Sequence, residues 1–252
     1  MTFWDHLDEL RSVLIRCGVI VIVFAVVAFC FRDELFYVVL APGDDDFCLY
    51  RLFRSFVELP PFHVDLINTA LARQFIIHMQ MAFSAGIIAA SPYLLFEMFR
   101  FVAPALYENE RRWFVPALVG SYVMFVVGAV VSYAVIFPLT FRFLGTYQVS
   151  PDVPNLVTLD SYVSTLFSLT LAMGLVFELP VVCWILGRMG VLTAPMMRSV
   201  RRQAVVAILV AAAVITPTGD AFTLLVVSLP VWVLYEGSIL LLPGAVSPHP
   251  PR

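Results

Sequence analysis

The chain has 252 residues, of which 61% are hydrophobic and only 13% are charged, and its formal net charge is −3. A soluble domain carries about 45–50% apolar and about 25% charged residues, so this composition indicates an integral membrane protein and excludes an ordinary soluble domain. The net negative charge argues against a nucleic acid partner. The four cysteines form no C-x-x-C pair, so neither a disulfide framework nor a metal site such as zinc is predicted.

The amino-terminal segment, MTFWDHLDELRSVLIR, does not read as a secretory signal peptide. Asp5, Asp8 and Glu9 stand where a positively charged region would be needed, and the apolar run that follows shows no small-residue cleavage site. We interpret it as a short amphipathic segment that leads into a retained helix.

Six apolar stretches approach the roughly 20 residues that a helix needs to cross a hydrocarbon core about 30 Å thick. The second is too long for one straight crossing, so we expect Pro92 to kink it or its end to lie along the interface. The fifth reaches only about 21 Å, which predicts thinning of the bilayer or contact with partners. The six expected spans are residues 13–31, 72–104, 114–140, 161–187, 203–217 and 222–242.

The fold class that follows is an all-α membrane protein with a single transmembrane domain over residues 1–242 and a disordered tail over 243–252. Prolines stand within the spans, and each removes a backbone donor and frees an upstream carbonyl. Singly they indicate ordinary kinks. Together they predict curved helices that frame a concave, glove-like bundle. The prolines are Pro92, Pro116, Pro138, Pro180 and Pro230.

The arginines predict the orientation, because cytoplasmic loops carry an excess of basic residues. All 15 basic residues are arginines. An even number of spans places both termini on one side, and the arginines divide ten to five in favour of that side. We therefore expect both termini in the cytoplasm. The five arginines on the opposite side are Arg32, Arg51, Arg54, Arg73 and Arg142.

Acidic residues gather at the side expected to be cytoplasmic. Asp5, Asp8 and Glu9 precede the first span, Glu108 and Glu110 lie between the second and third, and Glu178 lies within the fourth. Carboxylates in a weakly hydrated setting suit guanidinium groups, which bind them through two parallel hydrogen bonds. If Glu9 and Glu110 lie near each other, they would prefer an Arg-Arg pair to a Lys-Lys pair. Local pairing with neighbouring arginines is the alternative, and we favour it for Glu108.

Glu178 is the acid whose position is most costly. On insertion scales an acid at a helix centre costs roughly 2.5–3.5 kcal/mol, whereas each Leu, Val, Ile or Phe contributes about −0.3 to −0.6 kcal/mol, so its apolar neighbours outweigh it. An intramembrane ionisable residue is a candidate functional residue. The plainer interpretation is an acid satisfied by a serine or a backbone carbonyl. We expect no second span to carry an acid at depth.

Five motifs follow one another along the chain: WDHLDELRSVLI, FRFVAPALYENERR, FPLTFRFL, MGLVFELPVV and ITPTGDAF. In this order, and with six spans, they resemble the TatC family, the receptor subunit of the twin-arginine protein translocase. The similarity covers roughly residues 3–242.

The resemblance implies roles for individual residues. Glu9 and Glu110 match the carboxylates that recognise the twin-arginine motif of signal peptides, and Glu178 matches the polar residue that faces the concave membrane cavity. The rest of the signal-peptide patch is matched by Leu10, Arg11, Phe101, Pro104, Leu106, Tyr107 and Arg111. Pro42 matches a proline of the first outer loop. Thr216, Pro217 and Asp220 match the last outer loop, beside the docking sites of partner subunits.

The resemblance also implies a multimeric complex in the cell inner membrane, with single-span partners of the TatA/TatB type and energy from the proton gradient. It implies no cofactor and no enzymatic activity. Two alternatives remain from the residues alone: a small-solute secondary transporter, which proline-broken helices permit, and an intramembrane hydrolase with Glu178 as its acid or base. The absence of inverted halves weighs against the transporter, and the lack of an H-E-x-x-H or G-x-S-x-G motif weighs against the hydrolase.

Overall fold

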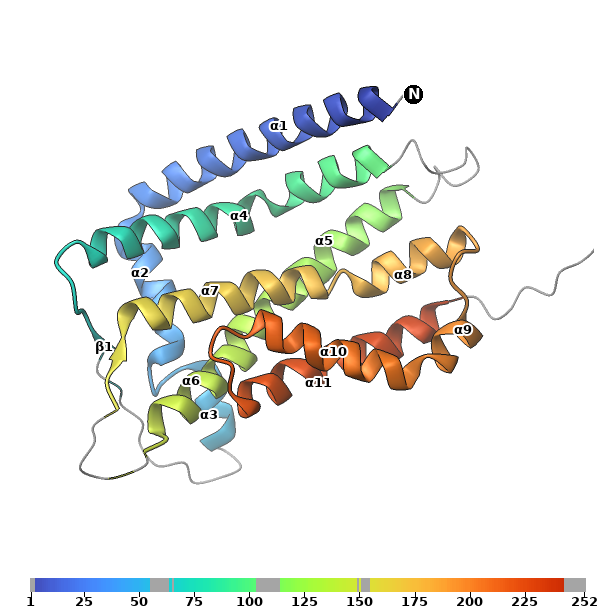
Figure 1. The fold of residues 1–252 in the computed structure, drawn as a ribbon. Coiled ribbons are helices and arrows are strands. Elements are labelled where there is room, and N and C mark those ends of the chain that lie inside the picture. Colours follow the sequence, from blue (N-terminus) through green and yellow to red (C-terminus); the bar gives the residue numbers. More distant parts are fainter. Residues whose placement is uncertain are drawn as a thin grey trace, which may run out of the picture.

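A computed structural model describes residues 3–54, 64, 66–102, 114–148, 150 and 155–242. Long helices make up most of this structure (Figure 1). The helices are α1 (Phe3–Cys30), α2 (Arg32–Leu40), α3 (Cys48–Arg54), α4 (Arg73–Val102), α5 (Phe114–Val131), α6 (Phe137–Thr146), α7 (Leu159–Val176), α8 (Leu179–Arg188), α9 (Ala194–Ser199), α10 (Arg201–Ile215) and α11 (Ala221–Leu241). The all-α class is confirmed, with the small addition of two parallel strands, β1 (Leu66–Ile67) and β2 (Val157–Thr158).

Five stretches of the described chain are long and apolar enough to cross a membrane. They are Leu7–Cys30, Arg73–Phe101, Phe114–Thr146, Leu159–Arg188 and Ala221–Leu241. Each overlaps a span expected from the sequence. The fifth expected span corresponds to α10, which has 15 residues and is too short to count as a candidate span by length. The sixth crossing therefore stays a prediction.

The prolines act in different ways. Pro92 lies inside α4, which remains one continuous helix. Pro138 follows a π-helix, η4 (Ser132–Ile136), that joins α5 to α6. Pro180 stands at the start of α8, after a two-residue turn that ends α7. The amino-terminal segment and the first expected span form one helix, because α1 runs without a break from Phe3 to Cys30.

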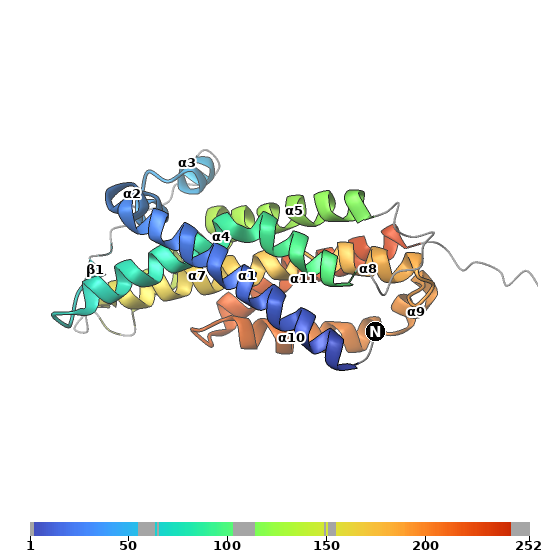
Figure 2. The ribbon, with the colours of Figure 1, turned by 90° about the horizontal axis from the view of Figure 1, so that it is seen from above.

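The helices form layers with α7 at the centre. Figure 1 shows α1 and α4 along one edge, α10 and α11 along the opposite edge, and α7 with α8 between them. Seen from above, α2 and α3 lie at one end of the molecule, and α9 and the amino-terminus lie at the other (Figure 2). We call these the outer end and the inner end. The core is built around α7, where Val163, Leu169 and Met173 are fully buried.

Two glycines allow α5 to pack closely against α7. A Cβ atom on Gly128 would lie 2.6 Å from the carbonyl oxygen of Met173, and one on Gly174 would lie 2.8 Å from the ring of Phe125. A larger residue at either position would push the two helices apart. This contact fixes the antiparallel register that brings Ser121 of α5 opposite Glu178.

Candidate functional site

The inner end of α1 carries three of the residues expected to bind a ligand. Glu9 and Leu10 are half-buried, and Arg11 is exposed. Buried or half-buried positions recur along α1 every three or four residues and continue the face on which Glu9 and Leu10 lie; they are Val13, Arg16, Cys17, Ile20, Val21, Ala25 and Ala28. Because α1 packs mainly along α4, this narrow stripe is its contact with that helix. Glu9 therefore lies on the α4 side of α1.

The register of α1 and α4 places Glu9 level with the end of α4. Arg16 pairs with Glu97, and Ala25 lies against Gly86, so the two helices run antiparallel. Glu9 precedes Arg16 by about 10 Å of helix, and Phe101 follows Glu97 by about 6 Å. Both residues thus lie at the inner end. Phe101 is half-buried there.

The other residues of the expected patch lie between α4 and α5 in the chain. They are Pro104, Leu106, Tyr107, Glu110 and Arg111, and all five fall outside the described residues. The tail over residues 243–252 falls outside them as well.

A buried carboxylate, Glu97 of α4, stands next to this inner end. Its Oε2 accepts a hydrogen bond from Nη2 of Arg16 at 2.9 Å, and its Oε1 accepts one from the hydroxyl of Tyr93 at 3.0 Å. The guanidinium of Arg100 lies 3.8 Å from Oε1. Glu97 is 1% exposed, so these contacts supply the compensation that a buried charge needs.

Glu97 corrects the expectation that no second span carries an acid at depth. Glu236 of α11 is a further example, since its Oε2 accepts a hydrogen bond from Arg201 of α10 at 2.5 Å. Both acids stood in the sequence inside apolar stretches. The signal that identifies Glu97 is the presence of an arginine, Arg16, at a matching depth in the neighbouring span.

Glu178 lies at the break between α7 and α8, where it precedes the first residue of α8. Pro180 has no backbone N–H to continue the helix, and the resulting turn directs the carboxylate toward α5. The hydroxyl of Ser121 donates a hydrogen bond to Oε2 at 2.5 Å. The plainer interpretation, an acid satisfied by a serine, therefore describes one of the two oxygens. Within the described part of the chain, Oε1 is buried without a hydrogen-bond partner.

Helix geometry gives the depth of Glu178. It precedes the end of α8 at Arg188 by about 15 Å of helix, and Ser121 follows the start of α5 by about 10 Å. Glu178 thus lies well inside the apolar layer, on the inner half of its span. α4 contacts both α1 and α7, so it separates Glu178 from the surface of α1 that carries Glu9.

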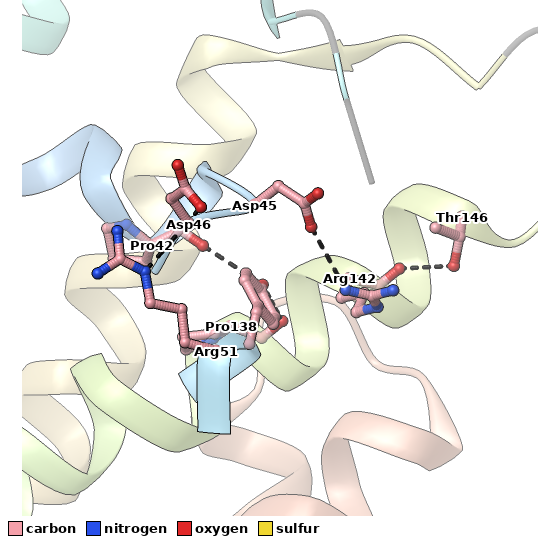
Figure 3. A network of polar contacts seen from close by, with 8 residues as sticks. Pro42, Asp45, Asp46, Arg51, Pro138, Arg142 and Thr146 are labelled. Carbon is pink, nitrogen blue, oxygen red and sulfur yellow. Dashed lines mark hydrogen bonds and ion pairs between the residues drawn. The ribbon is translucent and has the colours of Figure 1, made fainter. Parts of the chain in front are cut away.

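Pro42 belongs to a hydrogen-bonded cap at the outer end (Figure 3). The hydroxyl of Tyr50 donates to the carbonyl of Pro138 at 2.8 Å and lies 3.3 Å from that of Pro42. Burial raises the pKa of Tyr50, which keeps its hydroxyl protonated as a donor. From α7, the hydroxyl of Tyr162 donates to the carbonyl of Val39 at 3.0 Å. Pro42 is buried, so its role on this structure is to shape the cap.

The last outer loop is organised by Asp220, which caps α11. Its Oδ1 accepts from the backbone N–H of Thr223 at 2.7 Å, and its Oδ2 accepts from the hydroxyls of Thr218 and Thr223, each at 2.6 Å. Burial alone would raise the pKa of Asp220, but these hydrogen bonds outweigh it and the pKa is lowered from its ordinary value. Thr216 is buried and Pro217 is exposed. Thr218 also lines a cavity of about 320 Å³, together with residues of α6, β2 and α7.

A family model described as Sec-independent protein translocase protein (TatC) matches residues 5–230 of the chain. The chain belongs to the TatC family. A Sec-independent protein translocase protein TatC from Deinococcus radiodurans is 34% identical over 239 residues, which are 94% of this chain and 84% of the relative. The TatC of Aquifex aeolicus is 32% identical over 242 residues, 96% of this chain and 94% of the relative.

Solved structures agree with this assignment. A crystal structure of the twin-arginine translocase receptor TatC superposes on the chain with a TM-score of 0.75 at 32% identity, and the match covers 94% of this chain and 97% of that one. The chain is therefore a core subunit of the twin-arginine translocase and, with its several apolar helices, a multi-pass membrane protein. TatC membership gives no support to the solute transporter or the intramembrane hydrolase.

Proposed function

We propose that this TatC chain is the receptor that binds twin-arginine signal peptides of folded precursors at the cytoplasmic face of the inner membrane. The observation that carries the proposal is the position of Glu9, half-buried on the α4 side of α1 and level with the end of α4. Glu110 follows α4 in the chain and precedes α5. Two carboxylates at this end suit two guanidinium groups, each bound through a planar fork.

The rest of the mechanism extends from this docking step. Further residues complete the binding patch for the signal-peptide residues beside the arginine pair. They are Leu10, Arg11, Phe101, Pro104, Leu106, Tyr107 and Arg111. The apolar part of the signal peptide then moves along the concave face of the bundle toward Glu178.

Assembly with partners takes place on α10 and α11. α10 has 15 residues and spans about 22 Å, less than the thickness of a hydrocarbon core. As the sixth crossing it would thin the bilayer or recruit single-span partners of the TatA/TatB type, with Thr216, Pro217 and Asp220 at the outer edge of that surface. Both termini lie in the cytoplasm, the complex is multimeric, and the proton gradient drives export.

The docking step is tested by crosslinking. Glu9→Ala combined with Glu110→Ala removes both carboxylates and is expected to abolish crosslinking of a photoreactive twin-arginine precursor to membranes that contain this chain. The matched control is Asp8→Ala combined with Glu108→Ala, which removes the same charge from neighbouring positions and should leave crosslinking intact. Unchanged crosslinking in the first double variant would contradict the proposal.

A further inference from the structure

Helix α1 is held to the molecule along a single narrow face. Of its apolar window only 11% is buried, compared with 44% for the span formed by α7 and α8. Large apolar side chains such as Leu14, Val19 and Val23 are exposed on its other faces. Within a bilayer these faces meet lipid. Lipid is as apolar as they are, so burial of apolar surface does not hold α1 in place.

Close packing holds the outer half of α1. A Cβ atom on Gly86 of α4 would lie 2.7 Å from the backbone nitrogen of Ala25, so the two helices touch almost backbone to backbone. One turn further out, the ring of Phe29 stacks on the ring of His78, with centroids 4.1 Å apart and planes 15° apart. Small residues that allow such an approach are the usual basis of helix association in membranes.

The inner half of α1 is held differently. Its one described polar link to α4 is the ion pair between Arg16 and Glu97, and Val13 is the one buried apolar residue among residues 7–16. Glu97 is buried and also held by Tyr93, so α4 supplies the fixed half of the pair. The side chain of Arg16 is 39% exposed, so Arg16 is the more mobile partner of the ion pair.

The receptor residues of α1 extend beyond this pair. Glu9 lies about 10 Å closer to the amino-terminus than Arg16 and on the same face, because seven residues make about two turns. If α1 tilts about its closely packed outer half, Glu9 therefore moves further than Arg16 and the residues between Glu9 and Arg16. Glu97 itself is poorly placed as a ligand for a signal peptide, since it is 1% exposed and already bound to Arg16.

From this geometry, and resting on the proposed receptor function, we infer that Glu97 and Arg16 are positioning residues that fix the inner half of α1 and thereby set the distance between Glu9 and the end of α4. The signal peptide is read by Glu9 and Glu110. The Arg16–Glu97 pair keeps Glu9 level with the end of α4, after which the chain continues toward Glu110.

The test combines a distance measurement with a binding measurement on the purified full chain in nanodiscs. Spin labels on Ser12 of α1 and Met98 of α4, both exposed, report the separation of the inner halves in a background without the native cysteines. A fluorescent twin-arginine signal peptide reports affinity. Arg16→Gln and Glu97→Gln are each expected to broaden the distance distribution and to weaken binding at least about tenfold.

Two further variants make the result specific. Arg100→Gln removes a charge 3.8 Å from the same carboxylate, but Arg100 lies on α4 and does not link it to α1, so distances and affinity should stay as in the unaltered chain. Arg16→Lys keeps a cation beside Glu97 and should restore most of the affinity that Arg16→Gln loses. Retained helicity and a monodisperse elution profile show that each variant has folded.

Other outcomes separate this inference from the proposed function. Unchanged distances in Arg16→Gln, or broadened distances with full affinity, would overturn the positioning role. Weakened binding with unchanged distances would also overturn it, because the pair would then contact the peptide directly. Broadened distances in Arg16→Gln, together with full binding to the chain that carries Glu9→Ala and Glu110→Ala, would instead refute the receptor assignment and leave the fixing of α1 in place.

Discussion

The outer and inner ends of this TatC chain are built in different ways. At the outer end, tyrosine hydroxyls bind backbone carbonyls of the first outer loop, β1 pairs with β2, and Arg73 forms an ion pair with Asp160. At the inner end, Arg16 pairs with Glu97 and Arg201 with Glu236, and the hydroxyl of Tyr235 donates a hydrogen bond to the carbonyl of Met197. The tyrosine hydroxyls hold the outer loops against the bundle from buried positions, whereas the ion pairs of the inner end leave the side chains of Arg16 and Arg201 39% and 51% exposed. The outer end therefore serves as a scaffold, and the inner end is suited to binding a charged ligand.

The largest expected effect comes from loosening the scaffold. Tyr162→Phe keeps the edge contacts with Phe137 and Phe141 but removes the hydroxyl that binds Val39. The buried carbonyl of Val39 loses this hydrogen bond, which should lower the free energy of unfolding by about 1–3 kcal/mol. Unfolding of the purified chain in mixed detergent, followed by circular dichroism, measures this change.

The same variant separates the two ends. Tyr162→Phe should leave the affinity for a twin-arginine peptide unchanged, because it acts at the end opposite Glu9. The control is Tyr147→Phe, since Tyr147 is 63% exposed and its replacement should change neither stability nor affinity. A loss of peptide affinity in Tyr162→Phe without unfolding would show that the two ends are coupled, which contradicts the division drawn here.

Asp220→Ala is expected to have a smaller effect on the scaffold. It removes the cap of α11 and should cost about 1 kcal/mol of unfolding free energy. Because its pKa is lowered in the folded chain, Asp220 stabilises fully at pH values above its ordinary pKa of about 4, and this contribution is lost as the pH falls through the lower folded value. The stability difference between the unaltered chain and Asp220→Asn, measured against pH, should therefore be flat above about pH 4 and shrink below it. A difference that grows on acidification would have the wrong sign.

The smallest expected effect is at the outer surface. Arg51 lies 3.9 Å from Asp46, and both side chains are largely exposed. Exposed pairs of this kind contribute about 0–1 kcal/mol, so Arg51→Ala should leave the thermal midpoint almost unchanged. A clear fall in that midpoint would show that the outer cap depends on its charges as well as on its tyrosines.

The apolar spans could be predicted from the sequence because span length is a local property. The expected stretch over residues 72–104 became α4, Arg73–Val102, and the stretch over 222–242 became α11, Ala221–Leu241. The outer cap could not be predicted in the same way. Tyr162 and Val39 are 123 residues apart in the chain, and nothing near either residue indicates the other.

The inner end was predicted in part. Glu9 and Glu178 were identified as candidates, because acids beside or within apolar runs are visible in a sequence. Glu97 was overlooked, although it also lies in an apolar run. Its burial follows from the pairing of α1 with α4 and from the register that brings Arg16 beside it, and both are properties of the folded chain.

Competition between two signal peptides tests the central claim most directly. Binding of an Arg-Arg peptide and of its Lys-Lys counterpart should be titrated against the full chain in nanodiscs, and then against the chain that carries Glu9→Gln and Glu110→Gln. The account predicts strong preference for the Arg-Arg peptide in the unaltered chain and loss of that preference in the variant, because the amide cannot form the charged planar fork. Equal binding of both peptides to the unaltered chain, or an undiminished preference in the variant, would contradict it.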